Sequence, residues 1–152
     1  MPELPPCGLY KTLRPLADKV PAGRLVFFHN HGEPGAGIYL PERWHLNRAQ
    51  FSKNGFPIPS PEWAKDLEPL PAEGFYRVRE PFHCCDKRCR LFEAESLVQL
   101  GYDGEAHPLL FVPEWTDEGM AIPDTGTSID AGRLAKLSPL KVPHTTLPAE
   151  AH

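Results

Sequence analysis

Three of the chain's four cysteines lie within six positions, in the segment PFHCCDKRCRLFEAE at residues 81–95. If the flanking residues pair as strands, residues 86–88 form the turn and Cys85 lies directly opposite Cys89. Two thiolates at that separation can share one zinc ion, because Zn–S bonds are about 2.3 Å long. A tighter turn would instead pair Cys84 with Cys89, and we expect neighbours such as Cys84 and Cys85 to point in different directions. The sequence thus predicts half of a zinc site, with a disulfide or inert packing of small thiols as alternatives.

A second pair of candidate ligands is His29 and His31, in the segment FFHNHG. Side chains alternate along an extended strand, so both rings are predicted to project from the same side. Imidazole and thiolate are the usual zinc ligands, and zinc needs four of them in a structural site. The other residues of suitable type for such a site are Cys7, His45, His83 and His107.

The same histidines begin a known metal-binding pattern. Gly23, followed after five residues by His29-Asn30-His31, resembles the front of the motif with which cupin barrels hold a metal ion. The resemblance covers nine residues, and the glutamate and second motif of the family have no counterpart in the expected positions. It implies a small metal-dependent β-barrel enzyme in which His29 and His31 are ligands.

Motifs of other enzyme classes are absent from the sequence. There is no G-x-S-x-G nucleophile elbow, no G-x-x-x-x-G-K-[ST] phosphate loop and no dinucleotide-binding glycine pattern. A Cys–His nucleophile stays open, formed by Cys84, Cys85 or Cys89 with His29 or His31. The basic residues Lys87, Arg88 and Arg90 would lower the thiol pKa, although no third orienting group is evident. The balance favours a non-catalytic protein.

An acidic stretch occupies residues 91–132, which contain nine Asp or Glu and no Lys or Arg. Such a stretch repels a phosphate backbone, so we expect no nucleic-acid partner. Its most promising segment is VPEWTDEG, because Trp is enriched where proteins meet. The residues predicted to contact a basic protein partner are Glu114, Trp115, Asp117 and Glu118. The alternative is an acidic face that only maintains solubility.

The elements that position these residues are predicted to be short strands. The chain has 152 residues and 19 prolines, and proline removes a backbone donor, so long helices are disfavoured. We predict a mainly β fold: a small antiparallel barrel or sandwich of about six or seven short strands with one or two short helices. The strands are placed at 25–28, 38–40, 75–82, 90–100, 109–112, 120–122 and 140–142, and the helices at 61–68, capped by Ser60, and 131–137, capped by Asp130.

The organisation is predicted to be one β-rich domain at residues 9–145, with tails at 1–8 and 146–152 and no internal repeat. The longest apolar run is residues 25–28, so we expect neither a signal peptide nor a membrane segment. The cytoplasm is therefore the expected compartment, where thiols stay reduced.

Together these features predict a non-catalytic cytoplasmic adaptor or immunity-type protein that presents an acidic surface to a basic partner. The alternatives are a cupin-like enzyme that uses His29 and His31, and a domain stabilised by zinc at Cys85 and Cys89. The cofactor is accordingly either none or zinc, and the oligomeric state is not predicted.

Overall fold

The chain folds into short antiparallel strands, as the sequence predicted. The structure is a computed structural model, and it describes residues 3–31 and 35–143. Within these residues there are sixteen strands and two short 3-10 helices, so the chain is divided more finely than six or seven strands. Turns and hairpins break up the longer predicted strands. The predicted tail at 146–152 lies outside the described residues.

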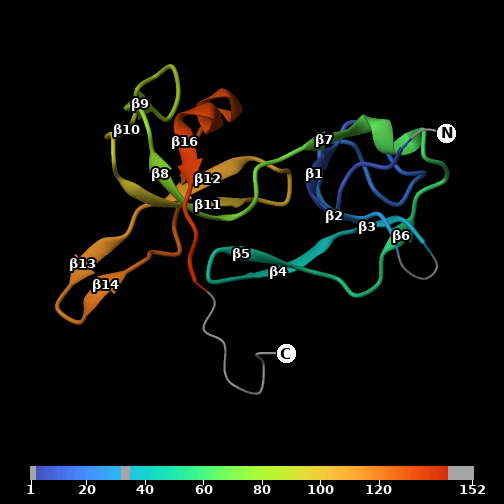
Figure 1. Cartoon of the computed structure of the whole chain (residues 1–152), viewed down its shortest axis with the longest axis horizontal. Helices are drawn as coiled ribbons and strands as arrows, with labels where there is room; N and C mark the ends of the chain where they lie inside the picture. The colour runs from blue at the N-terminus through green and yellow to red at the C-terminus, as the bar shows by residue number, and fades with distance from the viewer. Residues whose placement is uncertain (1–2, 32–34, 144–152) are drawn as a thin grey trace.

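The first sheet has five strands in the order β6-β3-β2-β1-β7, all antiparallel (Figure 1). Its strands are β1 (Gly8–Thr12), β2 (Leu25–His29), β3 (Gly37–Tyr39), β6 (Phe56–Pro57) and β7 (Leu67–Pro69). A separate hairpin, formed by β4 (Pro41–His45) and β5 (Arg48–Phe51), leaves the sheet between β3 and β6. The 3-10 helix η1 (Trp63–Asp66) leads directly into β7.

The second sheet also has five antiparallel strands, in the order β15-β12-β11-β8-β16. Its strands are β8 (Gly74–Val78), β11 (Leu97–Tyr102), β12 (Pro108–Phe111), β15 (Thr127–Ser128) and β16 (Leu137–Pro139). The cysteine-rich arm contains β9 (Phe82–His83) and β10 (Leu91–Phe92), and the acidic hairpin contains β13 (Glu114–Thr116) and β14 (Gly119–Ala121). The 3-10 helix η2 (Ala131–Lys136) leads into β16.

The two sheets are structural repeats of each other. In each, three strands are followed by a hairpin, a fourth strand, a 3-10 helix and a last strand that pairs with the first. The registers agree pair by pair: Gly8↔Phe28 with Gly74↔Leu100, Phe27↔Tyr39 with Gln99↔Phe111, Gly37↔Pro57 with Leu109↔Ser128, and Tyr10↔Pro69 with Tyr76↔Pro139. The prediction of no internal repeat is therefore wrong.

The repeat also has a sequence counterpart, GLYKTLRPL at 8–16 and GFYRVREPF at 74–82. Its two tyrosines make the same contact: Tyr10 donates to the carbonyl of Pro6 and Tyr76 to that of Ala72, each at 2.6 Å. Few other identities survive, and the spacing between matching positions changes along the chain. The repeat is evident from strand registers rather than from identical residues.

The interior contains two apolar clusters that join the halves. The first cluster gathers Tyr10, Val26, Phe28, Ile38 and Trp63 with smaller neighbours, all from the first half. The second belongs mainly to the second half but includes Leu25 and Ala49 of the first half. The Leu25 N–H also donates to the Gly104 carbonyl at 3.0 Å. The halves therefore share buried surface, as in one packed unit.

Both predicted helices are present as helical turns of a different type. Instead of an α-helix over 61–68, η1 covers only Trp63–Asp66, with Glu62 rather than Ser60 at its N-cap and no side-chain capping hydrogen bond. Leu67 is already paired with Thr12 in the sheet, so a longer helix would remove β7. Asp130 does precede η2, but its carboxylate accepts no capping hydrogen bond from the helix.

The sheets end in the edge strands β6, β7, β15 and β16, so the described strands form no closed barrel. This arrangement fits the sandwich alternative of the fold prediction and removes the barrel that a cupin-like site would require. Among the described residues, no helix is long and apolar enough to cross a membrane.

Candidate metal centres

The first candidate site contains Cys7, His29 and His31. Gly8 of β1 pairs with Phe28 of β2, so the residues just beyond these positions, Cys7 and His29, meet at the same end of the sheet. His31 follows two positions later. Cys7 belongs to the segment predicted as a tail, yet it supplies the sulfur of this site, which the predicted ligand pair lacked.

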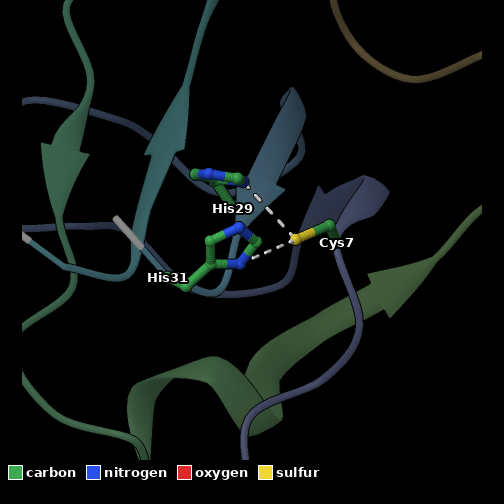
Figure 2. Close-up of side chains that lie close together, drawn as sticks. All are labelled: Cys7, His29 and His31. Carbon is green, nitrogen blue, oxygen red and sulfur yellow. Dashed lines mark hydrogen bonds between the residues drawn. The ribbon is translucent and has the colours of Figure 1, made fainter. Parts of the chain in front are cut away.

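The three side chains converge at distances suited to zinc (Figure 2). The Cys7 Sγ lies 3.4 Å from His29 Nδ1 and 3.8 Å from His31 Nδ1. With Zn–S bonds of about 2.3 Å and Zn–N bonds of about 2.0–2.1 Å, tetrahedral zinc places a sulfur and a nitrogen ligand about 3.5 Å apart. The rings of His29 and His31 lie side by side with centroids 4.1 Å apart, although β2 ends at His29 and the strand alternation used to predict their shared side does not reach His31.

Asn30 fixes the geometry of this site from between the two histidines. Its backbone N–H donates to Cys7 Sγ at 3.3 Å, and its side-chain amide donates to the Pro5 carbonyl at 3.1 Å. Its Oδ1 lies 2.8 Å from His31 Nδ1. The contacts to Cys7 and Pro5 orient this segment for a metal ion, whereas the contact to His31 Nδ1 uses the nitrogen that would coordinate and must open when an ion binds. Cys7 and His31 are exposed and His29 is half-buried, so an ion can reach the site from solvent.

The second candidate site lies at the tip of the β9–β10 arm. Cys84 N–H donates to the Arg90 carbonyl, and Arg88 N–H donates to the Cys85 carbonyl, at 2.9 and 3.0 Å. Residues 86–88 are therefore the turn, as predicted, with Arg88 in the left-handed region at φ 56°. The Sγ atoms of Cys85 and Cys89 are 4.0 Å apart, which confirms the predicted pair.

Cys84 adds a third sulfur to this pair. Its Sγ donates to the Cys85 Sγ at 3.6 Å, so the expectation that the two side chains diverge is wrong. The reason is that β9 ends at His83, and alternation between faces does not extend beyond the strand. Cys84 is buried, Cys85 half-buried and Cys89 exposed.

Hydrogen bonding shifts the pKa values of Cys85 and Cys89 in opposite directions. The backbone N–H of Cys89, the Cys84 thiol and the backbone N–H of Lys87 lower the pKa of Cys85. The pKa of Cys89 is raised, first by its hydrogen bond with the Cys85 sulfur and then by the charge of that sulfur. Cys85 therefore ionises more readily than Cys89.

The four predicted metal ligands thus divide between two groups rather than forming one site. His29 and His31 belong with Cys7, whereas Cys85 and Cys89 belong with Cys84. Within the described part of the chain, none of the remaining histidines considered above joins either group. His107, for example, lies against Asp103, with Nδ1 3.1 Å from a carboxylate oxygen.

The predicted partner-binding residues lie on the β13–β14 hairpin and its turn. Glu114, Trp115, Asp117 and Glu118 are all exposed, and Trp115 retains 85% of its accessible surface. Trp115 pairs with Met120, which is also exposed. In Figure 1 this orange hairpin projects away from both sheets.

The matching hairpin of the first half behaves differently. Trp44 Nε1 donates to the Tyr102 carbonyl at 2.8 Å, and the Asn47 side chain donates to Gln99 at 2.9 Å. The β4–β5 hairpin thereby docks onto the second half.

No known protein family, curated protein or solved structure matches this chain.

Proposed function

We propose that the protein binds a divalent transition-metal ion, with zinc as the best fit, through Cys7 Sγ, His29 Nδ1 and His31 Nδ1. The observation that supports this is the pair of sulfur–nitrogen distances, 3.4 and 3.8 Å, which bracket the separation of ligands around tetrahedral zinc. A thiolate with two imidazoles is a donor set that zinc shares with several borderline metals, and geometry then favours zinc.

Three protein ligands leave a fourth position on the ion. Asn30 Oδ1 lies 3.3 Å from the Cys7 sulfur, close enough to occupy this fourth position. Water or a ligand from another molecule can take its place. All four cysteines are free thiols, which supports function in a reducing compartment such as the cytoplasm.

The test is titration of the reduced, metal-free protein with Zn²⁺ and with Co²⁺, whose absorption reports thiolate and imidazole ligands. We expect Cys7→Ser and the double change His29→Ala with His31→Ala to abolish binding at this site. His45→Ala is the matched control, because His45 is exposed and belongs to neither group. Unchanged zinc affinity and stoichiometry in both site variants would refute the proposal.

A second function is favoured by the free β13–β14 hairpin: we propose that it docks a basic protein partner. Its counterpart β4–β5 is anchored through Trp44, whereas Trp115 is almost fully exposed beside Glu114, Asp117 and Glu118. A large exposed aromatic beside acidic side chains suits a partner that supplies both apolar contact and Lys or Arg.

This proposal predicts salt-sensitive association. Exposed charges are screened beyond about 8 Å at physiological ionic strength, so partner recovery should fall at high salt. Changing Asp117 and Glu118 to Lys should slow association with the recovered partner while leaving the unfolding curve unchanged. A recovered partner no more basic than background, or an unchanged association rate, would mean that the stretch serves solubility only.

A further inference from the structure

We propose that Cys84, Cys85 and Cys89 form a second metal site, an all-thiolate site that takes a soft monovalent ion, Cu(I), in preference to zinc. It differs from the first site in donor set, in its place in the fold and in the ion that it would select.

The first support is the length of the arm that bears the cysteines. In the first half, the matching arm is bridged between Leu16 and Val20, and only residues 17–19 lie between them. In the second half, Phe82 pairs with Phe92, and residues 83–91 lie between them. The second arm is six residues longer, and all three thiols lie in it. Because the short arm closes an equivalent sheet, the extra length is not needed for the fold.

The second support is the separation of the sulfurs. The Cys84–Cys85 and Cys85–Cys89 Sγ distances are 3.6 and 4.0 Å, and all three sulfurs lie within 4.8 Å of one another. Metal–sulfur bonds of about 2.3 Å place three trigonal ligands about 4.0 Å apart. The observed triangle is therefore close to the size that a three-coordinate ion requires.

The donor set then selects the ion. Three thiolates complete a trigonal Cu(I) site, whereas zinc, which is almost always four-coordinate in structural sites, would need a further ligand from solvent here, as it does at the first site. Thiolates are soft donors that favour Cu(I), and no imidazole or carboxylate in the group adds affinity for a borderline ion. The carboxylate of Asp86, in the turn, is held by Arg133 at 3.1 Å.

The surroundings suit a negatively charged metal–thiolate centre. Three thiolates and one Cu(I) carry two negative charges, and Lys87, Arg88 and Arg90 are adjacent along the chain. The turn is also held from the sheet side, because Asp130 N–H donates to the Cys84 carbonyl at 2.9 Å. Such contacts orient the ligands and offset their charge.

The test is an anaerobic titration of the reduced full-length protein with Cu(I) against a chromophoric Cu(I) chelator. We expect one equivalent to bind to the unmodified protein and to Cys7→Ser. Cys85→Ser and Cys89→Ser should weaken Cu(I) binding at least tenfold, and both positions are accessible enough for the fold to tolerate the change. Circular dichroism of each variant checks that the fold is retained.

The same variants separate this proposal from the first one. Cys7→Ser should lose zinc and keep Cu(I), whereas Cys85→Ser should lose Cu(I) and keep zinc. The all-thiolate site is refuted if Cu(I) binds Cys85→Ser and Cys89→Ser as tightly as the unmodified protein. It is equally refuted if the Cu(I) is lost in Cys7→Ser, or if the reduced unmodified protein binds no Cu(I).

Discussion

The two halves of the molecule share one strand arrangement, but they carry different side chains at the end of the sheet where the first candidate metal site lies. Where the first half has Cys7, His29 and His31, the matching positions of the second half are Glu73, Gly101 and Asp103. Conversely, only the arm of the second half contains cysteines. Strand pairing tolerates these exchanges, because the positions lie at strand ends and turns. The repeated strands therefore set the fold, and the side chains that differ between the two halves set the candidate sites.

One of these exchanges has a steric reason. A Cβ on Gly101 would lie 2.8 Å from the Asn47 carbonyl oxygen and 3.2 Å from Phe111. The β4–β5 turn of the first half occupies this space, so no histidine fits there. At the matching position of the first half, His29 is half-buried and faces Cys7 instead. Docking of the β4–β5 hairpin thus leaves no room in the second half for a side chain matching His29.

The largest effect is expected from truncating matched core residues. Phe28 and Leu100 occupy the same register position and are fully buried. We expect Phe28→Ala to destabilise the protein by about 3–5 kcal/mol and Leu100→Ala by about 2–5 kcal/mol. Because Leu25 belongs to the second core, denaturant unfolding should show one shared transition in each variant. Separate unfolding transitions for the two halves would show that they do not share one cooperative core.

A smaller loss is expected from filling the space beside the docked turn. Gly101→Ala should cost about 1–3 kcal/mol, because the added methyl group overlaps the backbone oxygen of Asn47. The matched change His29→Ala should alter stability by less than about 0.5 kcal/mol in metal-free protein, since its ring faces a solvent-accessible site. Equal losses in the two variants, measured by thermal or urea unfolding, would contradict the steric explanation.

Of the two hairpin tryptophans, the docked Trp44 should contribute more to stability than the exposed Trp115. Trp44→Ala removes a hydrogen bond to the Tyr102 carbonyl and is expected to cost about 1–2 kcal/mol. Trp115→Ala removes an exposed side chain and should remain within about 0.5 kcal/mol of the unmodified protein. A substantial loss for Trp115→Ala would show that this hairpin packs on the protein rather than standing free for a partner.

The smallest effect concerns Glu73, which matches Cys7 and accepts the Ala49 N–H at 2.9 Å. Burial raises the pKa of this carboxyl above its ordinary value of 4.5. Its contribution to stability is therefore fully present below pH 4.5 and is lost as pH rises through the higher native pKa. The free energy of unfolding of the unmodified protein, minus that of Glu73→Gln, should fall over this range. A constant or rising difference in urea unfolding would contradict the assignment.

The sequence was sufficient for the antiparallel β class and for local geometry. Proline content and the turn at residues 86–88 depend on neighbours along the chain. The missed features depend on distant ones. Cys7 meets the histidines only because β1 pairs with β2, and Cys84 turns toward Cys85 only because β9 ends early. Strand registers, not residue types, carry this information.

The order of pairing within the chain has a consequence for synthesis. All four strand pairings of the first sheet use residues 8–69, so each partner has been made before Gly74 of β8 is added. Domains that emerge first from the ribosome can fold first. We therefore expect the first half to form on the nascent chain. Leu25 and Ala49 of this half would then provide the surface on which the second apolar cluster packs. The later half would then assemble on a surface that already exists.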